Sequence, residues 1–255
     1  MKLRSLALLL MTAFTAHAAP VGNLRTLKAD AAQQWELVTD SGAHIRVGLP
    51  RADVLRIRAA PGKEFTGAGD KAASIVVGEA APDVQHSVKE EADHVLIQTA
   101  ALTLRIDRKP LRFTLYRAGE SQPLWREVQP LELSAKQSVQ VLSSDKSERF
   151  FGGGQQNGRF EFKGRQLDIS YSGGWEEGDR PSPAPFLMSS RGWGMLRNTW
   201  SDGSYDLRDS TQLTLEHAEN RFDAFDLVVK KMNGPRILLV KVIPRNLPPD
   251  SDEQD

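Results

Sequence analysis

The chain has 255 residues, with 33 Lys and Arg against 33 Asp and Glu, and it contains no Cys. The balanced charge argues against nucleic-acid binding, which usually needs a basic excess, and the lack of Cys excludes disulfides, Cys-ligated metals and thiol nucleophiles. Forty per cent of the residues are hydrophobic, enough for a folded core. No two of the five His lie within helical reach of each other, so we expect no metal site and no cofactor.

The first 19 residues have the pattern of an export signal. Lys2 and Arg4 precede an apolar run from Leu6 to Phe14, and the small-residue motif Ala16-His17-Ala18 follows. The run is shorter than the roughly 20 residues that span a bilayer, whereas this order is the one that a signal peptidase recognises. We expect cleavage after residue 18 or 19, a secreted or periplasmic location, and no membrane association afterwards.

Strand patterns dominate the rest of the chain. Polar and apolar residues alternate in short runs that are separated by turn sequences such as Asp40-Ser41-Gly42, and no helical pattern with caps is sustained. Such spacing predicts an all-β fold, an antiparallel β-sandwich or barrel. The predicted strands are 35–39, 43–47, 54–58, 95–99, 102–106, 112–116, 166–171, 192–200, 212–215 and 224–229.

Two stretches depart from the strand pattern. Residues 172–185 form the longest irregular segment, and long structured loops between strands often carry function. Beyond the apolar run 237–240 the chain becomes proline-rich and then acidic. This composition predicts an irregular C-terminal tail.

Two motifs suggest chemistry but have simpler explanations. The run Gly152-Gly153-Gly154-Gln155-Gln156-Asn157-Gly158 lacks the spacing of a phosphate-binding loop, and predicts instead a bulge or tight turn with positive φ. His217 and Glu219 share one face of a strand, which favours a paired surface residue over a metal ligand. No Gly-x-Ser-x-Gly motif is present for a serine hydrolase.

Acidic and aromatic residues gather between 168 and 209. The acids could supply the two carboxylates of a glycosidase, or simply lie on solvated faces, since 26% of the chain is charged. Exposed aromatic rings beside acids suit sugar binding. Trp193 alternates with Met195 and Arg197, which indicates a core or inter-domain position. The acids are at 168, 176, 177, 179, 202, 206 and 209, and the aromatic residues are Tyr171, Trp175, Trp193, Trp200 and Tyr205.

An ordered series of short motifs begins at Arg149. The motifs are Phe150–Gly158, Lys163–Ile169, Trp175–Gly178, Ser182–Phe186, Gly192–Trp200, Gly203–Leu207, Phe222–Phe225 and Gly234-Pro235. With the weaker upstream strands, this series resembles the N-terminal domain of family 31 glycoside hydrolases, the α-glucosidase and α-xylosidase group. The resemblance implies a galactose-mutarotase-like β-sandwich ahead of a catalytic (β/α)₈ barrel, with one loop lining the sugar site at the barrel mouth.

The resemblance also implies which residues bind substrate. Ser170–Gly173 stands where the family often has a Trp-Asn-x-Asp-like set, so Trp175, Glu177 and Asp179 remain as the substrate-binding residues of the loop. The sequence after Leu238 departs from the family, and it contains neither the nucleophile motif nor the barrel strands. We therefore expect a signal peptide (1–19), a β-sandwich (20–232), and a remnant linker with a disordered tail (233–255), with no catalytic residue.

The expected function is that of an N-terminal fragment of an exported α-glycosidase. It would bind an α-linked oligosaccharide weakly and would be inactive alone, because the catalytic domain is missing. Two alternatives stay open: a stand-alone carbohydrate-binding sandwich, and an inert product of a frameshifted gene. Absence of the barrel should expose apolar surface around Trp175, Phe186 and the 192–200 strand, so we expect self-association through the loop face or the tail.

Overall fold

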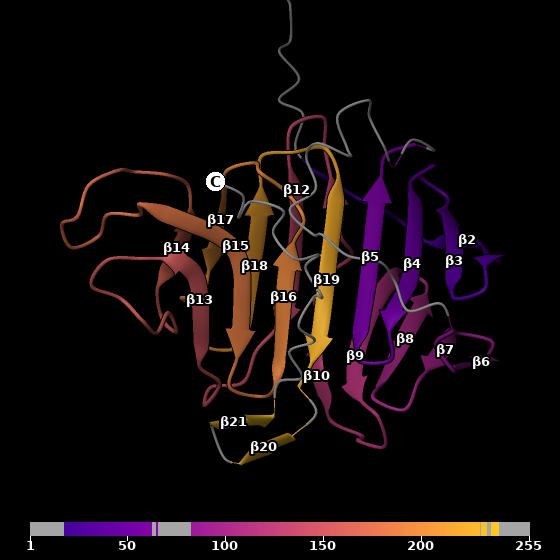
Figure 1. Ribbon diagram of the computed structural model, residues 1–255. Coiled ribbons are helices and arrows are strands. Elements are labelled where there is room, and N and C mark those ends of the chain that lie inside the picture. The colour runs from indigo at the N-terminus through magenta and orange to yellow at the C-terminus, as the bar shows by residue number, and fades with distance from the viewer. Residues whose placement is uncertain (1–17, 63–64, 66–82, 230, 234–235, 240–255) are drawn as a thin grey trace, which may run out of the picture.

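The computed structural model describes residues 18–62, 65, 83–229, 231–233 and 236–239. These residues contain no helix, and therefore none long and apolar enough to cross a membrane. Their strands are antiparallel and lie in two layers (Figure 1). The prediction of an all-β antiparallel sandwich is confirmed.

One layer is a single eight-stranded sheet, which faces the viewer in Figure 1. In spatial order its strands are β13 (Phe150–Gln155), β15 (Ser182–Ser189), β16 (Trp193–Arg197), β19 (Phe222–Val228), β5 (Val54–Ala60), β4 (His44–Arg51), β3 (Gln34–Thr39) and β2 (Leu24–Ala31). Strand β19, from the end of the domain, pairs with β5 from its beginning. This pairing joins the two halves of the sheet.

The second layer consists of two sheets behind the first. The six-stranded sheet runs β1 (Ala19–Pro20), β11 (Glu132–Leu133), β12 (Ser138–Ser143), β18 (Gln212–His217), β17 (Gly203–Asp206) and β14 (Gln166–Ile169). The five-stranded sheet runs β10 (Pro123–Arg126), β9 (Leu111–Arg117), β8 (Leu102–Arg108), β7 (His94–Gln98) and β6 (Ser87–Glu90). A β-bridge between Glu127 and Leu142 links the two sheets.

The core lies between the two layers and follows from strand periodicity. Successive side chains of a strand point to opposite faces, so β8 buries Leu102, Leu104 and Ile106 while Thr103 and Arg105 face outward. Buried residues from all three sheets form one continuous hydrophobic cluster. Trp193 is among them with 1% exposure, so it is a core residue.

The ten predicted strands are all present, with shifted ends, and further strands are added. Strand β13 contains the glycine run: its register shifts between Gly152 and Gly154, as expected of a bulge. Gly154 has φ of 74°, and a β-carbon there would lie 2.2 Å from the carbonyl oxygen of Ser182. Strand β15 already begins at Ser182, so the irregular segment ends earlier than the sequence suggests.

The C-terminal region contains one more described feature. Strands β20 (Lys231–Asn233) and β21 (Arg236–Leu239) pair as a hairpin where the sequence predicts the linker to begin. Residues 240–255 of the predicted tail, and residues 1–17 of the predicted signal peptide, lie outside the described residues.

Candidate functional site

The loop of residues 170–181 connects β14 to β15, and so passes from one layer to the other at the edge of the sandwich (Figure 1). Two hydrogen bonds close its stem: the Ser172 amide donates to the Arg180 carbonyl at 3.3 Å, and the Arg180 amide donates to Ser172 Oγ at 2.8 Å. The Arg180 guanidinium donates to the Ser170 carbonyl at 2.9 Å and lies 3.7 Å from an Asp168 carboxylate oxygen. Arg180 therefore fixes the base of the loop.

The tip of the loop is a turn held by Asp179. Its Oδ2 accepts a 2.9 Å hydrogen bond from the Glu176 amide, and its own amide donates to the Glu176 carbonyl at 3.1 Å. Gly174, at φ 79°, lies so close that a β-carbon there would be 2.1 Å from Asp179 Oδ2. The carboxylate of Asp179 thus shapes the turn that presents Trp175.

A second loop, residues 156–165 between β13 and β14, braces the first. The Asn157 amide donates to the Asp179 carbonyl at 3.0 Å, and the Gly178 amide donates to the Asn157 carbonyl at 3.1 Å. Gly158 has φ of 73°, and a β-carbon on it would lie 2.6 Å from Cγ of Glu177. The close approach of the two loops therefore requires glycine at position 158.

A small cavity of about 20 Å³ lies beneath the two loops, and Asn157, Asp168, Gly178 and Arg180 contribute to its wall. The Asn157 Nδ2 atom is buried without a hydrogen-bond acceptor. A volume of this size holds one water molecule.

The outer surface of these loops is strongly aromatic. Trp175 is 80% exposed and Tyr171 73% exposed on the 170–181 loop. Phe160 is 81% exposed on the bracing loop, and Trp200 is 74% exposed after β16. These four are by far the most exposed large hydrophobic side chains of the described residues, and exposed apolar groups of this size are candidates for contact with a ligand or a partner.

The structure brings the three sequence-predicted binding residues together on one loop but gives them different surroundings. Trp175 presents its ring to solvent, where it could stack on the C–H face of a sugar. Glu177 is exposed and could accept hydrogen bonds from hydroxyl groups. Asp179 is half-buried and bonded to the Glu176 amide. No group of three or more potential metal ligands occurs in the described part of the chain.

Sequence reasoning missed the residues that hold the loop. The sequence places Asn157 in the glycine-rich turn and in the motif Phe150–Gly158 but predicts no contact between it and the loop, and it singles out neither Arg180 nor the exposed Phe160. The glycines on either side of Gln155-Gln156-Asn157 are the available signal. Two of the other acids between 168 and 209 have local partners. The Asp206 carboxylate lies 2.6 Å from the Arg208 guanidinium, and the Asp209 carboxylate accepts from the Thr211 amide at 2.7 Å.

The prediction that His217 lies on the surface is wrong. His217 has 0% exposure, and its Nε2 lies 3.0 Å from the hydroxyl of Tyr205. Its strand, β18, lies in the interior of the six-stranded sheet and alternates buried and half-buried residues. The His217 side chain therefore faces the core, where its hydrogen-bonding partner is the Tyr205 hydroxyl.

Known structures share this fold. A family 31 dextranase from Flavobacterium johnsoniae, complexed with glucose, matches with 16% identity and a TM-score of 0.74, over 83% of this chain and 27% of its own. A cycloalternan-forming enzyme from Listeria monocytogenes matches with 15% identity and a TM-score of 0.69, over 83% of this chain and 21% of its own. A family 31 α-xylosidase from a soil metagenome, complexed with xylose, matches with 18% identity and a TM-score of 0.65, over 81% of this chain and 32% of its own.

The chain thus spans between about a fifth and a third of the length of these enzymes. A search of curated proteins finds no match. Residues 44–206, more than half of the chain, match the glycosyl hydrolase 31 N-terminal galactose mutarotase-like domain. The resemblance seen in the motifs is therefore confirmed, and the chain belongs to the family of glycosyl hydrolase 31 N-terminal galactose mutarotase-like domains.

Proposed function

We propose that the chain acts as the N-terminal domain of a glycoside hydrolase that cleaves α-glucosidic or α-xylosidic bonds. The family assignment over residues 44–206 supports this role. So does the fold, which the chain has in common with a dextranase, a cycloalternan-forming enzyme and an α-xylosidase.

In this role the 170–181 loop helps to position an α-linked oligosaccharide at the mouth of a catalytic barrel. Trp175 stacks against a sugar ring, Glu177 accepts hydroxyl hydrogen bonds, and Asp179 holds the turn between them. The exposed indole of Trp175, on a loop fixed both at its stem and by Asn157, is the observation that carries the proposal. A preorganised loop loses little conformational entropy when it binds.

The loop contributes binding and orientation rather than bond cleavage. A retaining glycosidase needs two carboxyl groups roughly 5 Å apart, one as nucleophile and one as acid, and we assign both to the barrel. Asp179 is bonded to the Glu176 amide and shapes the loop. We therefore expect the sandwich alone to bind sugar weakly without hydrolysing aryl α-glucosides or α-xylosides.

Tryptophan fluorescence tests the binding role directly. Trp35, Trp125 and Trp193 are buried, and Trp35 packs against His86, so the part of a sugar-dependent change that is lost in a Trp175 variant reports on the loop. Titration with maltose or isomaltose should give a dissociation constant of order 1 mM. The change should disappear in Trp175→Phe and persist in the matched control Trp200→Phe. An unchanged response in Trp175→Phe would refute the assignment, while a micromolar constant would favour the stand-alone carbohydrate-binding protein.

We also propose export to the periplasm, on the basis of the basic start, apolar run and small-residue motif of residues 1–18. Fractionation of a Gram-negative host that expresses the full chain, followed by N-terminal sequencing, tests this. We expect a periplasmic product that begins at residue 19 or 20. A cytoplasmic product that retains Met1 would contradict it.

A further inference from the structure

A polar groove lies at the end of the sandwich opposite the 170–181 loop. It has a volume of about 460 Å³ and is formed mainly by β6, β7 and β8 and the connections between them. Figure 1 shows β6 and β7 at one edge of the molecule and β14 at the other. Ligand sites typically occupy about 300–1,000 Å³, so this groove, which is shallow and open to solvent, has room for a small ligand.

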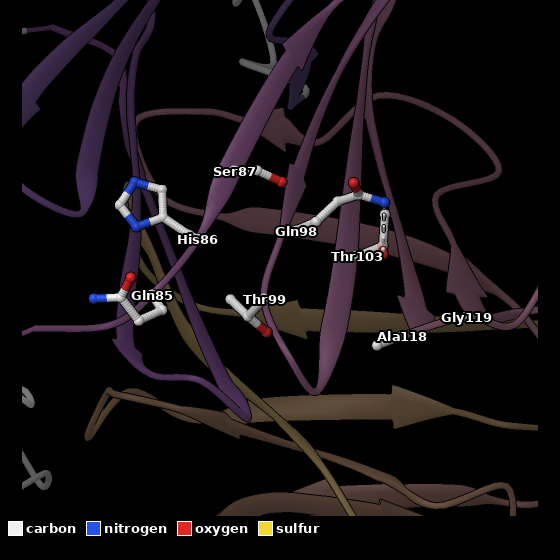
Figure 2. Close-up of a pocket in the computed structure, with 8 residues that line it drawn as sticks. All are labelled: Gln85, His86, Ser87, Gln98, Thr99, Thr103, Ala118 and Gly119. Atoms are coloured by element: carbon white, nitrogen blue, oxygen red, sulfur yellow. Dashed lines mark hydrogen bonds between the residues drawn. The ribbon is translucent and has the colours of Figure 1, made fainter.

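The groove is built on a row of side chains that crosses the sheet. Ser87 is paired with Gln98, Gln98 with Thr103, and Thr103 with Tyr116. Directly paired residues of an antiparallel sheet project from the same face. Figure 2 shows Ser87, Gln98 and Thr103 on three neighbouring strands, with Gln98 close to Thr103. Three hydrogen-bonding side chains and one aromatic ring thus follow one another across the outer face.

Contacts within the protein hold the walls of the groove in place without a ligand. Thr99 Oγ donates to the Ala52 carbonyl at 2.6 Å and accepts from the Leu102 amide at 3.0 Å, which fixes the turn between β7 and β8. The His86 ring packs edge-on against Trp35 with centroids 5.2 Å apart, and its Nδ1 lies 2.7 Å from the Val84 carbonyl. These contacts preorganise the floor and one wall of the groove.

The lining is uncharged. It consists of Gln, Ser, Thr, His, Ala and Gly residues, with no Asp, Glu, Lys or Arg. Beside the lining, Gln85 Nε2 donates to both carboxylate oxygens of Asp83 at 3.1 Å, and charged residues of the same strands form ion pairs, such as Arg105 with Asp107 at 2.7 Å. A phosphate or a carboxylate would find no positively charged side chain in this lining.

Hydrogen-bonding capacity remains at the exposed side chains. Ser87 and Gln98 are exposed, and the Gln98 amide reaches Thr103 Oγ only at 3.5 Å, the long limit of a hydrogen bond. Gln85 is exposed too, but its amide nitrogen already donates to Asp83. Amide and hydroxyl groups both donate and accept, which matches the hydroxyl groups of a sugar. We propose that this groove binds a neutral oligosaccharide, at a site separate from the 170–181 loop.

Amide chemical shifts of the ¹⁵N-labelled chain from residue 20, titrated with maltotriose, test this proposal. We expect saturable shifts at Ser87, Gln98, Thr103 and Gly119, which persist in Trp175→Phe. Because the loop is followed by fluorescence and the groove by local amide shifts, failure of one site leaves the other independently testable.

The variant Gln98→Ala/Thr103→Val removes the two central polar groups from an outward-facing surface, and should weaken binding about tenfold. Lys89→Ala, on the neighbouring row, is the matched control and should retain affinity. Glucose 6-phosphate should cause no stronger shifts than maltotriose. The proposal is overturned if maltotriose produces no saturable shifts in the groove, if the double variant binds as the unaltered chain does, or if the phosphorylated sugar binds more tightly.

Discussion

The hydroxyl of Tyr205 and Nε2 of His217 lie 3.0 Å apart in the core, on the paired strands β17 and β18. The Nδ1 atom of His217 lies 3.1 Å from the Ser201 carbonyl. A carbonyl can only accept, so Nδ1 carries the proton and Nε2 accepts from Tyr205. Burial, with the nearby Arg197 charge, lowers the pKa of His217 to about 3. The ring is therefore neutral, with both nitrogens used.

Replacement of Tyr205 by Phe should destabilise the sandwich. The change leaves Nε2 of His217 buried without a donor, and such an unsatisfied group costs about 1–3 kcal/mol. Urea denaturation should show that loss in the free energy of unfolding. Tyr116→Phe, on the outer face of β9, is the matched control and should have little effect. Equal stability of Tyr205→Phe and the unaltered chain would contradict the assigned hydrogen bond.

The protonation of His217 should be visible in a pH titration. Its folded pKa of about 3 lies below the ordinary value of 6.5, so the unfolded chain binds more protons between these values. The stability from neutral His217 is fully present above pH 6.5 and is lost as pH falls toward 3. Side-chain NMR should show no titration of His217 between pH 5 and 8. A midpoint near 6.5 would contradict the buried, neutral ring.

Asp226 and Glu127 should make the stability of the domain depend on pH in the opposite direction. Both are buried, and desolvation raises the pKa of Asp226 to about 8 and of Glu127 to about 7. Around Asp226, the Trp125 side chain and the Arg197 charge lower the pKa, whereas the Glu127 charge raises it. Between the ordinary pKa values, 3.8 for Asp226 and 4.5 for Glu127, and these raised values, the folded state binds more protons than the unfolded state. The stability that both groups contribute at low pH is therefore lost as pH rises toward 8.

The variant Asp226→Asn isolates this effect. The asparagine keeps the shape of the side chain but has no carboxyl proton to lose as pH rises. The free energy of unfolding of this variant should therefore fall less between pH 6.5 and 8 than that of the unaltered chain. His217 contributes little over most of that window, because its folded form is already deprotonated and its unfolded form, with a pKa of 6.5, loses its remaining proton early in the window. Thermal and urea unfolding measure these free energies. If the free energy of unfolding of Asp226→Asn falls with pH as steeply as that of the unaltered chain, Asp226 does not control the pH dependence of stability. Asp223→Asn, on the other face of β19, provides the control.

Local pattern predicted the strands whose residues alternate, such as Leu102–Ile106, because burial of every second residue is a property of the strand itself. Local pattern did not predict β13 and β15, because β13 contains three glycines and β15 two prolines. These segments are strands because they pair with each other. The contact of Asn157 with the 178–179 backbone joins residues more than 20 positions apart, so no local pattern contains it. The burial of His217 likewise depends on the place of its strand within the sandwich.

Gly158→Ala should loosen the candidate loop more than it affects the domain. Gly158 has positive φ and a β-carbon there would meet Glu177, whereas Gly164, also at positive φ, has nothing within 4 Å of its β-carbon position. Both variants carry backbone strain, but only Gly158→Ala also separates the two loops. Amide hydrogen exchange at residues 176–179 should therefore accelerate in Gly158→Ala alone. Equal protection of these amides in both variants would show that the bracing contact does not hold the loop.

The final prediction concerns association of the domain with itself. Four aromatic rings are exposed, and exposed apolar surface favours contact between molecules. They belong to Phe160 on the bracing loop, Tyr171 and Trp175 on the 170–181 loop, and Trp200 after β16. We expect the chain from residue 20 to self-associate with rising concentration and to bind a hydrophobic dye at neutral pH. Tyr171→Ser/Trp175→Ser should reduce both, because it removes two of the exposed rings while leaving the buried core intact.

Val128→Ser provides the comparison, since Val128 is a partly exposed apolar residue outside these loops. Light scattering and dye titration should show Val128→Ser associating as the unaltered chain does, while the double variant shifts toward the monomer. If the unaltered chain is a monomer without dye-accessible apolar surface, the loops do not mediate self-association. If the double variant associates undiminished, the contact lies elsewhere, since the loss of two exposed rings must weaken an interface that contains them.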